Sequence, residues 1–552
     1  MRLACLVLAL LCSVCGLSAS PSNEQPFDTT VTLNVSKEGA LVPDGIYGQY
    51  LEHVEASEET IYPSLWDDKS SAADRRGVRM DVANATRALK TPVIRWPGGC
   101  FADVYHWKDG VGPLSSRKPT PNRHWGGTEI NKFGTDEFLD FCRLSGAKPY
   151  INVNLGSGTL DEALQWLEYC NGPSDKSQGR LRAVNGHKPP YGVKYWGIGN
   201  ETWGPWETGH ADADTYATSL TLWAHSMRNQ DAAIKILGVG SEEGNDSEWD
   251  RTVLRRAGAN IDFLTTHMYG VSTTYDGSEY EAFVFTPVYL ENRLGKMADL
   301  IQTETTHPVQ IAVDEWNIRH FFDGKQNRKS PRTQQDAIFA AGLFNAMVRL
   351  SPRVGMANYV FLANGNGTLL VRGDQIVWTP LAYTFQLYAQ LIAGNAVSAH
   401  VDGPGVIPPP AVTGFPGRKP AADYAASYSP WIDAVAVRTT TGALNVALVN
   451  RHKTITGRVR IDALESSGAS HTSLRAERMT QLASADIYSA NTFESPDVVK
   501  PASYNLRALD NRQSSTAGFS RTENGVLCPP HSVTFVEFSI GNSAQRGPQP
   551  RD

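Results

Sequence analysis

The sequence lacks three features that would place the chain in a specialised class: a basic run, a long apolar segment beyond its first twenty residues, and closely spaced cysteines. Its 51 Lys and Arg residues are outnumbered by 57 Asp and Glu residues, and the formal net charge is −6. Nucleic acids are not expected as partners, because they are bound by basic surfaces. No later segment reaches the roughly 18 apolar residues of a membrane span, so no membrane partner is expected.

The first 19 residues read as a secretory signal peptide. The segment "MRLACLVLALLCSVCGLSAS" carries Arg2, then an apolar run from Leu3 to about Val14, and ends in small residues near Ala19. This order is typical of a leader that is removed on export. The sequence therefore predicts a secreted, extracellular protein.

Few cysteines remain once the leader is set aside: Cys100, Cys142, Cys170 and Cys528. One disulfide and buried free thiols are both compatible with this number, and a disulfide-rich scaffold is excluded. Asn-x-Ser/Thr sequons begin at Asn34, Asn84, Asn200, Asn245 and Asn366. Glycans are expected on all of these except Asn200, which lies in a stretch that is predicted below to line a cleft.

Between residues 41 and 394, strand-like and helix-like segments alternate. Eight strand-like runs are predicted at Gly45–Leu51, Val93–Trp96, Pro149–Asn154, Lys194–Gly199, Ile234–Val239, Asp262–His267, Val309–Asp314 and Gly355–Phe361. The segment "TLDEALQWLEYCNGP" is typical of the helices between them, with Thr159 as its cap and Asn171-Gly172-Pro173 as its end. Eight such units predict a (β/α)8 TIM barrel, with a doubly wound open sheet as the alternative.

The pattern changes after Gly394. The stretch Val401–Pro420 is rich in Pro and Gly and predicts a loop, and short alternating runs follow in "DAVAVRTT", "ALNVALVNR", "GRVRIDAL" and "SVTFVEFSI". These runs predict an antiparallel β-sandwich, jelly-roll-like, over residues 395–541. Residues 20–40 contain a similar strand that is expected to pair with the sandwich, and residues 542–552 are expected to form a disordered tail.

Polar residues follow several barrel strands, and the carboxyl ends of such strands carry the chemistry of this fold. Glu201 follows the fourth strand and Glu315 the seventh, on opposite sides of a barrel mouth. Two carboxyl groups that face one bond are what glycoside hydrolysis requires. Nearby tryptophans can stack on sugar rings or fill the core, and both interpretations stand for Trp125, Trp203, Trp206 and Trp316.

No motif for a metal or cofactor is visible. The sequence contains no His-Glu-x-x-His and no paired Cys-x-x-Cys, and the glycines of Gly238–Gly244 have the wrong spacing and position for a dinucleotide fingerprint. No metal or cofactor is therefore expected. A serine nucleophile near Gly156–Gly158 has little support.

Several longer strings resemble the α-L-arabinofuranosidases of glycoside hydrolase family 51, in a secreted, fungal-type form. They are "RWPGGCFADVYHWKDGVGP", "GTDEFLDFCRLSGAKPYINVNLG", "KYWGIGNE", "GPW", "VDEWN" and "LCPPHSVTFVEF". The resemblance covers most of the chain. It implies a retaining, exo-acting enzyme that removes terminal α-L-arabinofuranosyl groups from plant cell-wall polysaccharides, with Glu201 as general acid/base and Glu315 as nucleophile.

The resemblance also implies roles for further residues at the barrel rim. Substrate-binding or positioning roles carry over to Glu52, Arg95, Cys100, Trp125, Asn200, His267 and Tyr269. The sequence departs from the family pattern at two places. Phe361 occupies a place where relatives often have Gln, and the segment after Glu315 does not resemble the corresponding segment of the family. A retaining endo-glucanase or xylanase on the same barrel, and a carbohydrate-binding protein without catalysis, remain the alternatives.

Overall fold

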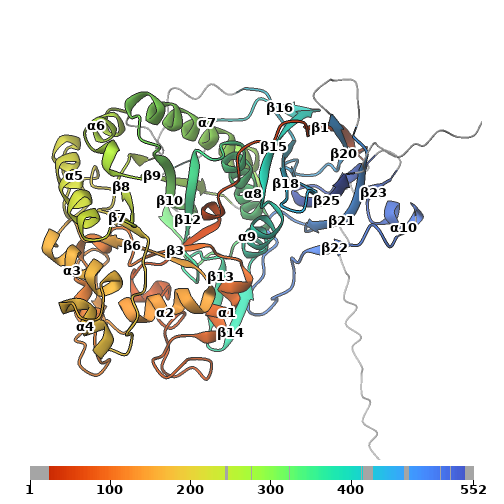
Figure 1. Ribbon diagram of the computed structural model, residues 1–552. Coiled ribbons are helices and arrows are strands. Elements are labelled where there is room, and N and C mark those ends of the chain that lie inside the picture. The colour runs from red at the N-terminus through yellow and green to blue at the C-terminus, as the bar shows by residue number, and fades with distance from the viewer. Residues whose placement is uncertain are drawn as a thin grey trace, which may run out of the picture.

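The computed structural model describes residues 24–242, 247–274, 276–322, 324–411, 413, 427–464, 472–509, 511–521 and 524–540. Two bodies lie side by side, a barrel with its helices and a β-sheet domain (Figure 1). The predicted leader (1–19) and tail (542–552) lie outside the described residues. Among the described residues, no helix combines the length and apolarity that crossing a bilayer would require.

Eight parallel strands close into a barrel. They are β2 (Gly48–Tyr50), β3 (Val93–Trp96), β6 (Lys148–Val153), β7 (Tyr195–Ile198), β8 (Lys235–Gly238), β9 (Phe263–Ser272), β10 (Gln310–Phe322) and β12 (Val354–Val360). Strand β10 pairs with both β9 and β12, and β12 pairs with β2, so the sheet has no open edge. The TIM-barrel prediction is confirmed, and the open-sheet alternative is wrong.

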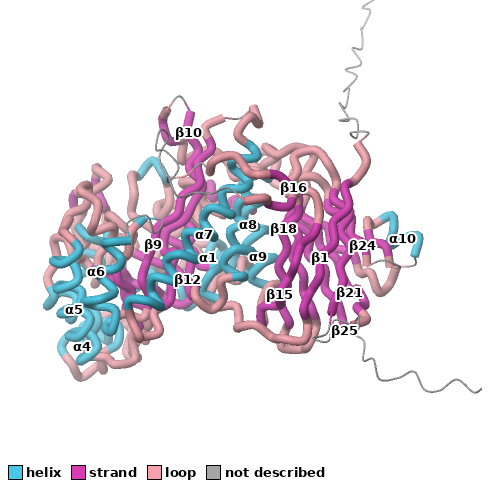
Figure 2. Tube along the Cα trace, turned by 90° about the horizontal axis from the view of Figure 1, so that it is seen from above, coloured by secondary structure: helices cyan, strands magenta, loops and turns pink. Residues whose placement is uncertain are grey.

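Three strand boundaries differ from the prediction. Residues 44–47 form a 3-10 helix, so β2 begins only at Gly48. Strands β9 and β10 continue well past His267 and Asp314, and their extensions pair up to Ser272 and His320. The extensions project from the barrel (Figure 2), where each strand satisfies the backbone groups of the other. The short β11 (Lys325–Gln326) then folds back on β10.

Helices surround the barrel. They are α1 (Met80–Ala88), α2 (Thr135–Ser145), α3 (Leu160–Asn171), α4 (Ser177–Val184), α5 (Ala213–Gln230), α6 (Ser247–Ala257), α7 (Tyr280–Glu304), α8 (Gln334–Arg349) and α9 (Pro380–Leu391). In α3 the predicted cap is present, because the side chain of Thr159 accepts a hydrogen bond from the Glu162 N–H. The buried side chains of α3 include Ala163, Trp166 and Leu167, whereas Leu160 and Leu164 are only partly buried.

The second body is a β-sheet domain with its own apolar core. Its strands lie in the order β22 (Ala502–Tyr504), β21 (Leu474–Leu482), β25 (Ser532–Ile540), β19 (Leu444–Asn450), β18 (Ile432–Arg438), β15 (Asn395–Asp402), β1 (Phe27–Asn34), β20 (Gly457–Leu464), β24 (Gly525–Cys528), β23 (Phe519–Ser520). The antiparallel prediction is confirmed except for one pair: the N-terminal β1 is antiparallel to β15 but parallel to β20. The loop predicted at Val401–Pro420 begins later than expected, since residues 401–402 complete β15 and residues 405–406 form β16.

Helices α8 and α9 lie between the barrel and the β-sheet domain (Figure 2). The Gln334 side-chain amide in α8 donates to the carbonyls of Leu482 and His531. Arg349 at the end of α8 pairs with Asp433 of β18 at 2.7 Å. These polar contacts hold the β-sheet domain on the side of the barrel away from α3 to α6 (Figure 1).

The structure separates the sequons by burial. Asn34 and Asn84 are exposed, and Asn245 lies outside the described residues. Asn366 is only 3% exposed, and its side-chain nitrogen donates to the carbonyls of Asn327 and Ser330. A glycan on this nitrogen is incompatible with the fold, so the expectation at Asn366 is corrected; the sequon pattern carries no information about burial. All four described cysteines have free thiols.

Candidate active site

A cavity of about 380 Å³ opens at the carboxyl ends of the barrel strands. Its lining comes from β9, β10, β11 and β12 and from the segments that follow β2, β3, β7, β8, β11 and β12: Glu52, Cys100, His124, Trp125, Glu201, Trp206, Glu242, Tyr269, Glu315, Asn317, Arg319, Gln326, Arg328, Val360, Phe361, Gly365 and Asn366. Both predicted catalytic carboxylates are among these residues. We call the buried group Glu52, Arg95, Tyr269 and Glu315 the floor, and the outer group Trp206, Glu242, Gln326 and Arg328 the mouth.

Glu315 is held by donors on both of its oxygens. Arg95 Nη1 donates to Oε1 at 2.9 Å, and the Tyr269 hydroxyl donates to Oε2 at 2.6 Å. The register of β10 against β9 shifts between Ala312 and Glu315, and this irregularity turns Asp314 and Glu315 toward the barrel interior. The carboxylate is thus fixed in position, with its charge opposite a guanidinium.

Arg95 is almost fully buried and is itself positioned by several acceptors. Its Nη2 donates to Asn200 Oδ1 at 2.9 Å, and Nη1 lies 3.3 Å from the Asp314 carboxylate. Burial disfavours the charge of Arg95, but the charges of Asp314 and Glu315 outweigh this and raise its pKa. Asp314 in turn has a lowered pKa: burial opposes its charge, and the charge of Arg95 and a hydrogen bond from His267 prevail.

Glu201 occupies a left-handed backbone conformation, with φ of 40°, directly after Gly199 at 81° and Asn200. A glutamate in this region is strained, and such residues concentrate at functional sites. Its Oε2 accepts a hydrogen bond from the indole of Trp206 at 2.9 Å, and its Oε1 lies 2.7 Å from His267 Nδ1. Burial raises the pKa of Glu201, but the bonds and charge from His267 and Trp206 bring it below its usual value.

His267 lies between the two carboxylates. Its Nδ1 is 3.5 Å from Glu315 Oε2, and its Nε2 is 3.3 Å from Asp314. Burial lowers the pKa of His267, but the Glu315 charge and the bonds with Asp314 and Glu201 raise it well above its usual value. Carboxylate oxygens of Glu201 and Glu315 lie within 4.8 Å of each other and of His267.

Two glycines allow the segment after β3 to approach the floor. A Cβ on Gly99 would lie 2.2 Å from Glu315 Oε1 and 2.8 Å from Asn200 Oδ1. A Cβ on Gly98 would lie 2.4 Å from Glu52 Cγ. Glu52 Oε1 accepts the N–H groups of Gly99 and Phe101 at 3.1 and 3.0 Å. The string "PGG" therefore reflects close packing of backbone against two carboxylates.

Of the remaining predicted residues, Cys100 and Trp125 line this cavity, and Asn200 lies behind the lining in contact with Cys100. Asn200 is buried, accepts from Arg95, and donates to Glu207 Oε1 at 3.2 Å. The Trp125 ring lies at the cavity under the guanidinium of Arg328, 4.8 Å from its centroid.

The structure shows which of the predicted tryptophans lie in the core and which lie at the cavity. Trp316 is fully buried and stacks on Phe385 in the core. Trp206 is 48% exposed and lines the cavity, and Trp203 supports it edge-on at 5.2 Å between centroids. Phe361 lines the cavity, and so does Gln326 of β11.

Sequence reasoning assigned no role to Asp103, His124 and Glu207. Asp103 is buried, and its carboxylate accepts the N–H groups of Leu155 and Asn200 at 3.1 Å each; burial raises its pKa to about 7. Burial also raises the pKa of Glu207 to about 8. Asp103 lies within the string that begins at Arg95, and Glu207 follows Gly204-Pro205-Trp206. No pattern in the sequence indicates their roles, because the partners of Asp103 lie 52 and 97 residues away and the raised pKa of Glu207 depends on its burial.

Comparison with known proteins gives concordant results. Residues 85–283 match the model of an α-L-arabinofuranosidase 1 domain, and residues 314–521 match that of an α-L-arabinofuranosidase C-terminal domain. The chain is 32% identical to α-L-arabinofuranosidase C of Emericella nidulans over 446 residues, 77% of this chain and 85% of that one. The chain belongs to the α-L-arabinofuranosidases of glycoside hydrolase family 51.

Solved structures agree with this assignment. An α-L-arabinofuranosidase from Thermotoga maritima in complex with arabinose superposes with a TM-score of 0.80 at 32% identity, over 92% of this chain and 99% of that one. The family 51 enzyme of Thermotoga petrophila gives 0.81 at 33% identity, over 92% and 99%. An intracellular exo-α-L-arabinofuranosidase of Bacteroides ovatus is 33% identical over 398 residues, 69% of this chain and 76% of that one.

Proposed function

We propose that this family 51 member is a retaining, exo-acting α-L-arabinofuranosidase, with Glu315 as nucleophile and Glu201 as general acid/base. One observation carries the proposal: oxygens of the two carboxylates lie within 4.8 Å of each other across a cavity, and both contact His267. Retaining glycosidases separate their carboxyl groups by about 5–5.5 Å, and inverting ones by about 6.5–9.5 Å to admit a water.

In the first step, a Glu315 oxygen attacks the anomeric carbon while Glu201 donates a proton to the leaving oxygen. Arg95 and Tyr269 orient Glu315 through both of its oxygens, which leaves its remaining lone pairs for the attack. The C–O bond to the leaving group breaks, and a covalent glycosyl-enzyme forms.

His267 supplies the proton that Glu201 needs. In the free site the raised pKa of His267 and the lowered pKa of Glu201 place the shared proton on the imidazole. The 2.7 Å contact between Nδ1 and Oε1 allows this proton to move to Glu201 as the leaving oxygen gains charge. In the second step Glu201 takes a proton from water while the water oxygen attacks the anomeric carbon. The bond between this carbon and Glu315 breaks, and arabinose is released.

The floor and the residues next to it recognise the sugar itself. Glu52 and Cys100 line the cavity together with Glu315, and Glu52 is fixed by two backbone N–H groups. Asn200 lies behind them, in contact with Arg95 and Cys100. Trp125 and Trp206 offer aromatic faces on the leaving-group side. This arrangement fits one terminal furanosyl group in the cavity, with the rest of the substrate at the mouth.

The natural substrates are arabinose-substituted plant cell-wall polysaccharides such as arabinoxylan and arabinan, and their oligosaccharides. An endo-glucanase or xylanase has less support, because the family match over both domains is to arabinofuranosidases. A carbohydrate-binding protein without catalysis has less support because both carboxylates are present with their positioning partners.

Secretion is part of this proposal and rests on the leader at residues 1–19. The intracellular relative from Bacteroides ovatus means that family membership alone does not decide the location. Expression of the full chain in a eukaryotic host tests it: the protein should accumulate in the medium, start near Ser20, and carry glycans at Asn34 or Asn84. Retention in cells with Met1 intact would contradict it.

The decisive assay is hydrolysis of 4-nitrophenyl α-L-arabinofuranoside, with the β-D-xyloside and β-D-glucoside alongside, and NMR of the sugar that first appears. Release from the arabinofuranoside with retained configuration is expected. Inverted configuration would exclude the double displacement, and cleavage only of internal glucan or xylan bonds would restore the endo alternative.

The role of Glu201 is tested by comparing leaving groups. Glu201→Ala should slow hydrolysis of a natural arabino-oligosaccharide by about 10²–10⁴-fold, the usual contribution of general acid catalysis. The first step on 4-nitrophenyl arabinofuranoside should lose far less, because nitrophenolate leaves without a proton. Equal losses on both substrates would assign Glu201 another role.

A further inference from the structure

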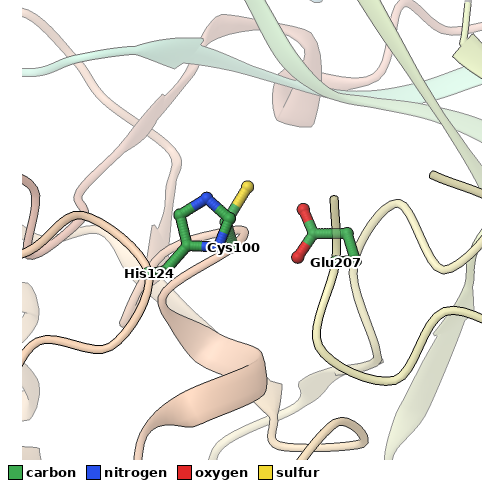
Figure 3. Close-up of side chains that lie close together, drawn as sticks. All are labelled: Cys100, His124 and Glu207. Carbon is green, nitrogen blue, oxygen red and sulfur yellow. The ribbon is translucent and has the colours of Figure 1, made fainter. Parts of the chain in front are cut away.

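Beside the catalytic pair, three side chains from separate segments converge on one point. Cys100 follows β3, His124 lies between the short strands β4 (Thr120–Pro121) and β5 (Thr128–Glu129), and Glu207 follows β7. One donor atom from each lies within 4.8 Å of the other two. Figure 3 shows the thiol, the imidazole and the carboxylate around a common gap. None of the three has a part in the proton transfers or the nucleophilic attack.

Glu207 gives the strongest indication that this gap takes a ligand. Its side chain is 5% exposed, and Oε1 accepts from Asn200 Nδ2 at 3.2 Å. The other oxygen, Oε2, is buried without any hydrogen-bond partner among the described residues. An orphaned buried carboxylate oxygen is costly, and binding a cation is one of the ways proteins offset that cost.

We propose that Cys100, His124 and Glu207 form a binding site for a divalent cation of Zn²⁺ type at the wall of the sugar cavity. A thiolate, an imidazole and a carboxylate are the donors that Zn²⁺ takes, at about 2.3, 2.0 and 2.1 Å. Donors on one tetrahedral ion lie about 3.2–3.8 Å apart, so the site closes through side-chain movements of about 1 Å. His124 is half-buried in a loop and has room for such a movement.

The surrounding charge favours a cation. Glu52, Glu201 and Glu315 line the same cavity as Cys100 and His124. Carboxylates that share a cavity with low-dielectric walls attract cations to it. Burial raises the pKa of Glu207 to about 8, so its carboxyl group holds a proton near neutral pH. Binding therefore releases two protons to solvent, one from the Cys100 thiol and one from Glu207, and the thiolate and the carboxylate balance the charge of the ion.

The fourth coordination position of the ion would face the cavity, since Cys100 and His124 both line it. A cation there takes space beside the sugar and draws the Glu201 carboxylate away from the leaving oxygen. Zn²⁺ therefore acts as a reversible inhibitor. This consequence rests on the proposed function, whereas the binding site itself does not.

Binding is measured first, without substrate. Chelator-treated protein is titrated with Zn²⁺ against a chromophoric chelator, and with Co²⁺ to detect the near-ultraviolet absorption of a metal–thiolate bond. One Zn²⁺ per chain and a Co²⁺–thiolate band are expected. Cys100→Ser should abolish the band, and Cys100→Ser, His124→Ala and Glu207→Gln should each weaken Zn²⁺ binding by at least about tenfold.

His106→Ala is the matched control, because His106 lies outside the cavity and contacts Glu162 at the surface. Its Zn²⁺ affinity should equal that of the unmodified chain, and circular dichroism checks that each variant folds. No Zn²⁺ binding, binding that the three site variants retain, or a Co²⁺ complex without the thiolate band would each overturn the site.

Inhibition is measured second, as the ratio of activity with and without Zn²⁺ for each variant that retains turnover. The unmodified chain and His106→Ala should lose activity in Zn²⁺ and regain it with chelator, and His124→Ala should resist at least tenfold more Zn²⁺. Equal inhibition of His124→Ala would overturn the inhibitory role. Stoichiometric binding by a chain that hydrolyses no arabinofuranoside even when metal-free would instead contradict the proposed function.

Discussion

The floor and the mouth of the cavity are built in opposite ways. At the floor, Arg95 and Glu315 are almost fully buried, come from barrel strands, and are held by several hydrogen bonds each. At the mouth, Trp206 is 48% exposed and Arg328 belongs to the segment that follows the β10–β11 hairpin. The floor is fixed by the barrel, while the mouth depends on loops.

This difference separates two tasks. The floor must hold the nucleophile in one position while charge develops, and a displacement of about 1 Å can cost about 10²-fold in rate. The mouth meets whatever carries the arabinose, which varies between polysaccharides. Substitutions at the floor should therefore affect every substrate, and substitutions at the mouth should discriminate between them.

The largest effect is expected from Glu315→Ala. Without the nucleophile no glycosyl-enzyme forms, and kcat/KM should fall by at least about 10⁴-fold for natural and activated substrates alike. Steady-state kinetics on both substrate types measures it. Glu248→Ala, at an exposed surface glutamate, is the control and should leave the kinetics unchanged. A substrate that Glu315→Ala still hydrolyses at more than a hundredth of the normal rate would place the nucleophile elsewhere.

Gly99→Ala tests the same floor without removing a functional group. The added methyl would overlap Glu315 Oε1, so the carboxylate must shift, and kcat should fall by about 10²-fold on every substrate. Gly295→Ala in α7 is the matched control, because its Cβ would meet no atom within 4 Å. That variant should keep its activity and gain about 0.5–1 kcal/mol in stability by thermal unfolding. Normal kinetics in Gly99→Ala would show that Glu315 can move away from the added methyl group without loss of catalysis, and would contradict a rigid floor.

His267 connects the floor to the general acid, and its loss should change the pH profile. The pKa of His267 is raised, so its proton is retained above pH 6.5 and lost as pH rises further; the alkaline limb of kcat/KM should lie above that value. In His267→Gln only Glu201 carries the proton, and the limb should move at least about one pH unit lower, with a rate loss of about tenfold or more. His106→Gln should leave the profile in place, and an unmoved limb in His267→Gln would contradict the proton transfer.

The floor was largely predictable from the sequence because its residues stand at the ends of strand-like runs. A closed parallel barrel brings those ends to one rim, so Glu201 and Glu315 meet although 114 residues separate them. The contacts of Arg95 could be expected only through the family resemblance, since no local pattern shows that a guanidinium in β3 reaches β10.

The mouth and the wall were much less predictable. The extensions of β9 and β10 stabilise each other by pairing, a property of two distant segments that neither reveals alone. Glu207 and His124 become notable only when folding places them beside Cys100, 107 and 24 residues away in the sequence. A search for metal motifs depends on short spacings and does not detect such a group.

The smallest effect is expected at the mouth, from Arg328→Ala. Arg328 lies over the Trp125 ring, and such cation–π contacts contribute about 0.5–2 kcal/mol. Hydrolysis of 4-nitrophenyl arabinofuranoside should change by less than about threefold, because the floor is intact. On arabinoxylan, KM should rise by about two- to tenfold while kcat is kept, because the freed Trp125 no longer presents one fixed face to the xylan chain.

Arg372→Ala is the control: it removes a comparable contact with Phe493, at 4.1 Å and outside the cavity, and should leave the kinetics on both substrates unchanged. If Arg328→Ala slowed both substrates equally, the mouth would share the task of the floor, and the separation between the two regions would fail.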